Sequence, residues 1–320
     1  MGTTAGKNVG DGTYRRKAYH AGSWYEDDKQ ALGQTLQGYL DAAASEISNS
    51  SSHNNVRAVI APHAGYRYSG PTAAYGYLQL ERALNSSTDH PCEHILVLHP
   101  AHHVYLQGCA VSGASELETP LGNLPVDDEL RKEILALSSK FTVMDASTDN
   151  EEHSGEMQYP YLAKILLSMK QPPSVLPIMC GALSTFQEEL FGNLLAPIIA
   201  RPNVVCVISS DFCHWGSRFR YQPISKDGSI PIHQFIQEMD HRGMDLIAMK
   251  EPGAFAEYLK KTKNTICGRH AIAVWLQAIA SKDHSGLTVN FVKYAQSSAV
   301  KTMQDSSVSY ASAVVMASTA

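Results

Sequence analysis

Residues 204–215 read VVCVISSDFCHW, an apolar run that ends in a polar turn. Short runs of Val, Ile and Leu without alternation are typical of strands buried on both faces, as in a parallel sheet covered by helices. Two other runs have nearly the same form and also end at histidine-containing turns: Val56–Ile60 before APHAGY, and Ile95–Leu98 before HPAHH. The three runs predict an α/β fold.

Other segments of the chain alternate between strand and helix patterns. Further strands are expected at Val175–Met179, Thr288–Tyr294 and Val308–Val315. Helices are expected at Asp28–Ala43, Thr72–Leu84, Asp127–Leu137, Ser154–Met169, Ser184–Ala200, His233–Met249 and Ala271–Ala280. Within Ser154–Met169, Pro160 should kink the helix or start a second one. This alternation predicts a mostly parallel or mixed central sheet flanked by helices. No change in composition marks a boundary, so we expect a disordered tail over 1–13 and a single domain over 14–320.

The bulk composition excludes several classes of function. A net charge of −5 argues against nucleic-acid binding driven by overall electrostatics. The six cysteines form no CxxC pair, which favours a reducing compartment over a zinc ribbon or a disulfide scaffold. Neither a signal peptide nor an apolar run long enough to span a membrane is present. We therefore expect a cytoplasmic protein that also enters the nucleus by diffusion.

The turns after the three apolar runs carry side chains suited to metal binding and proton transfer. In an open α/β sheet, sites form beyond the carboxyl ends of the strands, so His63, Asp211 and His214 are expected in one crevice. His102 and His103 are adjacent and point in opposite directions in extended backbone, so only one should face it. Asp211 could be a ligand or cap a turn, and the near-neutral pKa of histidine suits His214 to proton transfer.

Cys267 stands out among the cysteines because it directly precedes an apolar helix. A helix start beside Arg269 should favour the thiolate, the form that binds metals and attacks electrophiles. The alternative is an inert, half-buried thiol. Glu152 and His153 also lie at a predicted helix start, where they could support the crevice or form a solvated first turn.

A polar and aromatic turn near the start of the chain, HAGSWY at 20–25, contains His20 and Trp24. These side chains could form one wall of a pocket. They could equally pin the N-terminal segment to the core, since tryptophan buries a large apolar area.

These motifs together resemble the Memo family, named for a mediator of ErbB-receptor-driven cell motility. The resemblance covers about residues 18–315. The matching stretches are HAGSWY at 20–25, IAPHAGY at 60–66, HH at 102–103, EHS at 152–154, SSDFCHWG at 209–216, CGRH at 267–270, KYAQSS at 293–298 and QDSSVSYA at 304–311. The chain departs from the family pattern at Gly155 and Gln158, where an apolar residue and a histidine are more usual.

The resemblance implies a fold similar to class III non-haem iron extradiol dioxygenases. It implies a metal site at His63, His102 and Cys267, with Asp211 close by and His214 as the acid/base histidine. The metal would be iron or copper. A thiolate in place of the carboxylate of the usual facial triad argues against simple ring cleavage, because a soft sulfur ligand favours copper(I) and alters the redox behaviour of iron.

Three functions follow from the residues and the resemblance. The first is a metal-binding protein with a redox role in cell signalling, motility or metal homeostasis. The second is a non-catalytic adaptor for phosphotyrosine-containing receptor peptides or signalling proteins, with Arg269 contributing anion contacts. The third is an extradiol-type dioxygenase.

Overall fold

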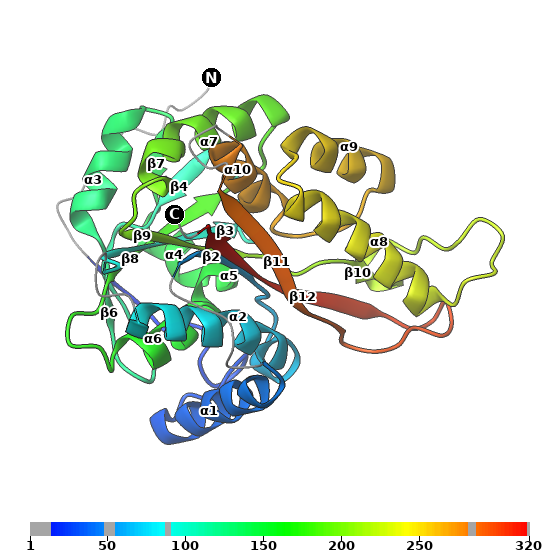
Figure 1. Ribbon diagram of the computed structural model, residues 1–320, viewed down its shortest axis with the longest axis horizontal. Helices are drawn as coiled ribbons and strands as arrows, with labels where there is room; N and C mark the ends of the chain where they lie inside the picture. The colour runs from blue at the N-terminus through cyan, green and yellow to red at the C-terminus, as the bar shows by residue number, and fades with distance from the viewer. Residues whose placement is uncertain (1–13, 48–54, 87–90, 281–285, 319–320) are drawn as a thin grey trace.

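A large mixed sheet forms the centre of the computed structural model, which describes residues 14–47, 55–86, 91–280 and 286–318 (Figure 1). The predicted tail over 1–13 lies outside these residues. In spatial order the strands are β10 (His214–Trp215), β12 (Ser307–Ala317), β2 (Val56–Ala61), β9 (Val204–Ser209), β3 (His94–Pro100), β8 (Ser174–Cys180), β4 (Cys109–Val111) and β7 (Phe141–Val143), and β11 (Leu287–Gln296) also pairs with β12. A smaller sheet contains β1 (Tyr14–Arg16), β5 (Ala114–Leu117) and β6 (Leu124–Pro125).

The middle of the large sheet is parallel and its margins are mixed. Strands β2, β9, β3 and β8 run parallel, whereas β12 is antiparallel to β2 and β4 is antiparallel to β8. All six strands predicted from the sequence are present, each within about two residues of the expected bounds. The expectation of an α/β fold with a mixed central sheet flanked by helices is confirmed.

Helices cover both faces of the sheet (Figure 1). Helices α1 (Lys29–Glu46), α2 (Tyr66–Ser86) and α6 (Tyr159–Leu166) pack together, and α2 contacts β2 and β12. Helices α7 (Thr185–Ile199) and α10 (Arg269–Ile279) pack on each other and on β9. The remaining helices are α3 (Asp128–Leu137), α4 (Ala146–Glu151), α5 (His153–Glu156), α8 (Ile232–Ala248), α9 (Pro252–Thr262) and the 3-10 turn η1 (Ser217–Phe219). None of the helices that the structure describes is long and apolar enough to cross a membrane.

Helix α2 begins six residues earlier than the sequence predicts and contains Pro71 in its interior. The expected start at Thr72 followed the ordinary rule that proline is disfavoured inside a helix. One long-range and one local hydrogen bond hold the earlier start. The backbone N–H of Tyr66 donates to Trp24 O at 2.9 Å, and the Ser69 hydroxyl donates to Ala64 O at 2.5 Å. The first turn of α2 therefore packs against the HAGSWY turn and brings that turn to the sheet edge.

The register of the sheet brings the three histidine-containing turns together. Strand β9 lies between β2 and β3, and its residues Ser209 and Ile208 pair with Ala61 and Leu98 respectively. The segments that follow these strands therefore leave the sheet at the same edge, as the sequence predicts.

Candidate metal centre

A cavity of about 710 Å³ lies at the edge of the sheet where β2, β3 and β9 end. Its walls come from segments that are far apart in the chain. The lining residues are Ser23, Trp24, His63, Ala64, Gly65, Tyr68, His102, His153, Asp211, His214, Arg218, Phe219, Ser297, Ser298, Val308 and Tyr310.

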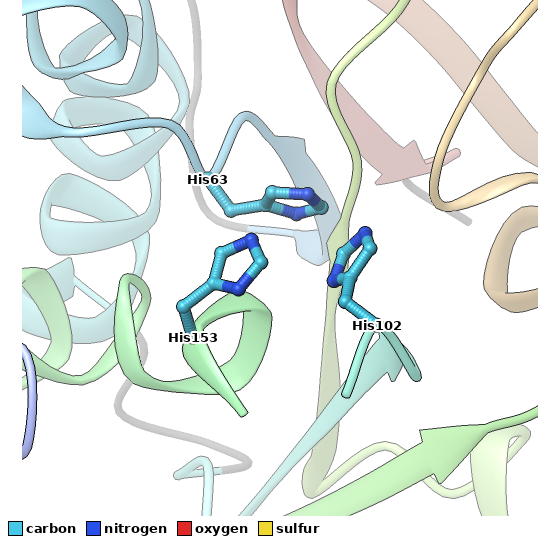
Figure 2. A group of neighbouring side chains, drawn as sticks. All are labelled: His63, His102 and His153. Carbon is cyan, nitrogen blue, oxygen red and sulfur yellow. The ribbon is translucent and has the colours of Figure 1, made fainter. Parts of the chain in front are cut away.

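Three imidazole rings converge in this cavity (Figure 2). His63 follows β2, His102 follows β3, and His153 is the first residue of α5. One nitrogen of each ring lies within 4.8 Å of the others. The rings of His102 and His153 are stacked with their centres 4.5 Å apart, and the His63 ring meets both edge-on. One nitrogen from each ring could therefore bind the same metal ion with little movement of the side chains.

A second donor group shares His63. The residues are His63, Asp211 and Cys267, whose potential ligand atoms also lie within 4.8 Å of one another. The Cys267 sulfur is 3.0 Å from His63 Nε2, and the backbone N–H of Asp211 donates to that sulfur at 3.2 Å. Among the described residues, these are the two groups of His, Cys, Asp and Glu with metal-binding geometry.

Glu152 orients His102. Its carboxylate accepts a hydrogen bond from His102 Nδ1 at 2.9 Å and another from the His102 backbone N–H at 2.6 Å. Burial acts to raise the pKa of Glu152, but the hydrogen bond and charge of His102 outweigh burial and hold that pKa well below its usual range. The carboxylate therefore fixes the ring so that Nε2 faces the cavity, the arrangement common for metal-binding histidines.

Burial keeps His63 and His153 uncharged at neutral pH. It lowers the pKa of His63 well below the usual value, with further lowering by the charges of His102 and His153. Burial and His102 also lower the pKa of His153 to about 3. Neutral imidazole is the form that binds metals, so these two rings need not lose a proton first.

The expected thiolate at Cys267 is contradicted by the structure. Burial, reinforced by the charge of Asp211, raises the pKa of the thiol well above its usual value, and the lowering by Arg269 is smaller. The sequence shows the helix start and the arginine but not the depth at which the sulfur lies. Metal binding by Cys267 would therefore release a proton.

Asp211 ties the turn after β9 to the turn after β2. Its Oδ1 accepts a hydrogen bond from the His63 backbone N–H at 2.8 Å, so it serves a neighbouring turn rather than the start of a helix. Burial raises its pKa to about 7 against the opposing effect of the His63 and Ala64 N–H groups. At neutral pH the carboxyl can accordingly hold or release a proton.

His214 also faces the cavity. Its Nε2 is buried and has no hydrogen-bond partner among the described residues. Burial, with His102 and Arg218, lowers its pKa to about 4. The ring packs edge-on against Phe219 with the centres 5.1 Å apart. An unpaired nitrogen at this position is suited to accept a hydrogen bond or proton from a molecule in the cavity.

The other predicted residues lie at different distances from the donors. Trp24 lines the cavity and lies 4.6 Å from the His153 ring, centre to centre. His20 lies behind Trp24 and binds Glu156 through Nδ1 at 2.9 Å. His103 is exposed and contacts the His153 ring edge-on at 5.7 Å. These three positions form the wall around His153.

Arg269 does not line this cavity. It is exposed at the start of α10 and lines a separate hollow that also contains Lys260, Lys263 and His270. The sequence places Arg269 two residues from Cys267 but cannot show that the intervening turn sends the two side chains in different directions. Among the described residues that line the candidate metal cavity, the basic side chain is Arg218 instead.

Sequence reasoning missed one whole wall of the cavity. Arg218 and Phe219 belong to η1, and Ser297, Ser298 and Tyr310 belong to the β11–β12 region. These residues do not follow a parallel strand, so the rule that located the histidines gives no signal for them. The motif KYAQSS at 293–298 contains Ser297 and Ser298, but nothing in its composition indicates a pocket.

Gly268 lets the Cys267 turn approach β9 closely. A Cβ atom at this position would meet Ser209 O and Ser210 Cβ, each at 2.4 Å. We expect Gly268→Ala to lower the free energy of unfolding by about 1–3 kcal/mol, measured by urea denaturation, because the backbone must move apart. Gly253→Ala in α9 is the control, since a Cβ there meets nothing within 4 Å. Equal stability of the two variants would show that Gly268 is not a required close contact.

Comparison with known proteins gives the chain a family. A family model described as Memo-like protein matches residues 16–314. The chain belongs to the Memo family. The Memo-like match spans both donor groups, which lie between His63 and Cys267.

Curated relatives of this Memo chain match over nearly its whole length. The Caenorhabditis elegans "Protein memo-1 homolog" is 41% identical over 96% of this chain and 84% of its own. "Protein MEMO1" of Homo sapiens is 41% identical over 92% of this chain and 95% of its own. Among solved structures, an uncharacterized protein from Escherichia coli K12 matches with a TM-score of 0.47 and 12% identity, over 79% of this chain and 98% of that one.

Proposed function

We propose that this Memo chain binds a transition metal, iron or copper, and uses it in redox chemistry connected with cell signalling, motility or metal homeostasis. The observation that carries the proposal is the convergence of three imidazoles on one cavity, with a thiol and a carboxyl that form a second donor group with His63. Imidazole suits iron and copper, and sulfur adds a preference for copper(I).

The chemistry of the donors fits such an ion. The His102 ring is held by Glu152 through Nδ1, which leaves Nε2 for a ligand bond. The cavity that the three histidines line also has the aromatic side chains of Trp24, Phe219 and Tyr310 in its walls. A metal held here would supply electron transfer or Lewis-acid chemistry to a molecule in the cavity.

The chain itself would supply binding and proton transfer. His214 Nε2 can accept a proton from a ligand in the cavity, and Asp211 is suited to exchange a proton near neutral pH. The exposed Arg218 at the rim would attract an anionic group. These roles for Asp211, His214 and Arg218 belong to the proposal.

Metal analysis of untagged protein tests the proposal directly. We expect stoichiometric iron or copper in protein purified anaerobically, and saturable binding of Fe(II) or Cu(I) by the metal-free protein in calorimetric titration. Absence of bound metal together with absence of binding heat for both ions would overturn the proposal.

Extradiol dioxygenase activity remains a second candidate because Asp211 adds a carboxyl to the donor set around His63. Two histidines and a carboxylate are the usual ligands of non-haem iron oxygenases. Loading with Fe(II), followed by catechol and oxygen, would reveal a coloured ring-fission product. The phosphotyrosine-adaptor hypothesis loses its expected contact, because Arg269 lies outside the cavity.

A further inference from the structure

The ring of His63 ends a chain of buried hydrogen bonds that runs through Ser209 and Gln158 to Tyr77. His63 Nδ1 lies 2.8 Å from Ser209 Oγ, and Gln158 Nε2 lies 2.8 Å from the same oxygen. The Tyr77 hydroxyl lies 2.7 Å from Gln158 Oε1. Every one of these side chains is buried. The residues come from four elements or their ends, so their alignment depends on the packed fold.

Two backbone carbonyls set the direction of this chain, because a carbonyl can only accept a hydrogen bond. Gln158 Nε2 also lies 3.2 Å from Pro62 O, which requires the amide nitrogen to be on that side. Gln158 therefore donates to Ser209 Oγ and accepts from Tyr77. The Ser209 hydroxyl lies 2.7 Å from Ser154 O, and its single hydrogen must point there.

The count of hydrogens leaves one possibility for the histidine. Ser209 Oγ donates its only hydrogen to Ser154 O and accepts one hydrogen bond from Gln158 Nε2. Its remaining lone pair can only accept, so His63 Nδ1 must carry the ring proton of the neutral imidazole. The lone pair then lies on Nε2, the atom that faces Cys267 at 3.0 Å.

We propose that Ser209 and Gln158 are positioning residues that fix His63 as the Nδ1–H tautomer and thereby direct its Nε2 lone pair into the metal cavity. The role given to this tautomer rests on the proposed metal site. The tautomer itself does not, since the directions of the hydrogen bonds are set by the protein alone. Outer hydrogen-bond partners of this kind typically contribute 10- to 100-fold to metal affinity.

Nitrogen NMR of the metal-free protein, with 15N-labelled histidine at neutral pH, tests the tautomer. We expect a protonated Nδ1 and an unprotonated Nε2 for His63, with the signals assigned by their loss in His63→Ala. A proton found on Nε2 in the wild-type protein would overturn the inference, whether or not any variant folds. This readout is independent of metal binding.

Two variants with a matched control test the positioning role. In Ser209→Ala, His63 should no longer be restricted to the Nδ1–H tautomer, and Fe(II) or Cu(I) binding should weaken by about 10- to 100-fold. Ser312→Ala is the control, because Ser312 is another buried serine of the sheet and its Oγ has no partner among the described residues. Gln158→Leu also removes three side-chain hydrogen bonds, as many as Ser209→Ala, but it leaves the Ser209 oxygen in place to accept from His63. We therefore expect a similar loss of stability and a smaller loss of metal affinity.

The outcomes separate this inference from the proposed function. If the tautomer is as expected but wild-type protein binds neither ion, the metal proposal fails and the positioning of His63 stands. If wild-type protein binds metal but Ser209→Ala keeps both the tautomer and the affinity, the positioning inference fails and the metal proposal stands. A general packing defect would instead weaken metal binding to a similar extent in Ser209→Ala and Gln158→Leu.

Discussion

His63→Ala is expected to cause the largest loss of metal affinity, because His63 is the donor that the two groups share. Its loss should lower the affinity for both Fe(II) and Cu(I) by more than about 100-fold, exceeding the effect of an outer hydrogen-bond partner. Calorimetric titration of the metal-free variant under anaerobic conditions measures this. His241→Ala is the matched control, since His241 is half-buried on α8, does not line the candidate metal cavity, and its Nδ1 contacts Gln237 O.

Two further substitutions distinguish the donor groups. We expect His153→Ala to weaken Fe(II) more than Cu(I), and Cys267→Ser to weaken Cu(I) more than Fe(II), because sulfur is the softer ligand. Titrations in buffers of different ionisation enthalpy should also show a proton released with Cu(I), since the Cys267 thiol is protonated before binding. Unchanged affinity for both ions in both variants would contradict the assignment of these ligands.

Arg16→Met should produce the largest loss of stability. Arg16 is buried and forms a 2.5 Å ion pair with the fully buried Glu156, and its guanidinium also donates to the carbonyls of Asp149 and Glu152. Removing one partner of a buried pair leaves an uncompensated charge, so we expect the free energy of unfolding to fall by about 3–5 kcal/mol. Urea denaturation measures this loss.

The neighbouring Arg15 gives a control in the same strand. Its ion pair with Glu116 is solvent-exposed, with side chains 52% and 40% accessible, so Arg15→Met should cost less than about 1 kcal/mol. Similar losses for the two variants would contradict the special role of Arg16. Because Glu156 and His153 lie in the same short helix, α5, the Arg16 variant should also bind metal more weakly.

The same pair predicts a dependence on pH. Burial tends to raise the pKa of Glu156, but Arg16 and the hydrogen bonds from His20 and Tyr25 lower it below the usual value. A lowered folded-state pKa stabilises the protein above the unfolded-state pKa of about 4.3, and that contribution is lost as the pH falls further. The acid-side loss of stability should therefore be smaller in Arg16→Met than in the wild type.

The central strands could be predicted from the sequence because each is a nearly continuous apolar run. Strands β2, β9 and β3 are buried on both faces, and this burial requires such runs. Strands β1, β4 and β7 have three residues each, too short for any period to be visible. Their positions are determined by pairing partners elsewhere in the chain.

Helix boundaries were less predictable where tertiary contacts determine them. The segment Ser154–Met169, in which Pro160 is expected to kink the helix or start a second one, is divided into α5 and α6 at Met157 and Gln158. Gln158 directs its side chain inward to Ser209 and Pro62, and Pro160 then occupies the start of α6. The helix α9 was not predicted, although Pro252 at its first turn is a recognised start signal.

The sequence predicted which turns form the candidate site, but not how deeply the side chains are buried or how they contact one another. The ends of the parallel strands located His63, Asp211, His214 and one of His102 and His103, because parallel strands bring their following turns to one edge, and the family resemblance selected His102. Sequence reasoning gave His153 only a supporting place, since the stacking of His153 on His102 arises from how α5 packs against β3. The protonation of Cys267 depends on burial, which a local motif does not reveal.

The separation of the donors along the chain has a consequence for assembly. His63 and Cys267 are 204 residues apart in sequence, yet their side chains are within 3.0 Å. A partly folded chain cannot offer this set of ligands, so capture of an ion must follow closure of the sheet rather than guide it. The ion would then stabilise the folded protein, because it would bind only the native state and so lower the population of partly unfolded forms.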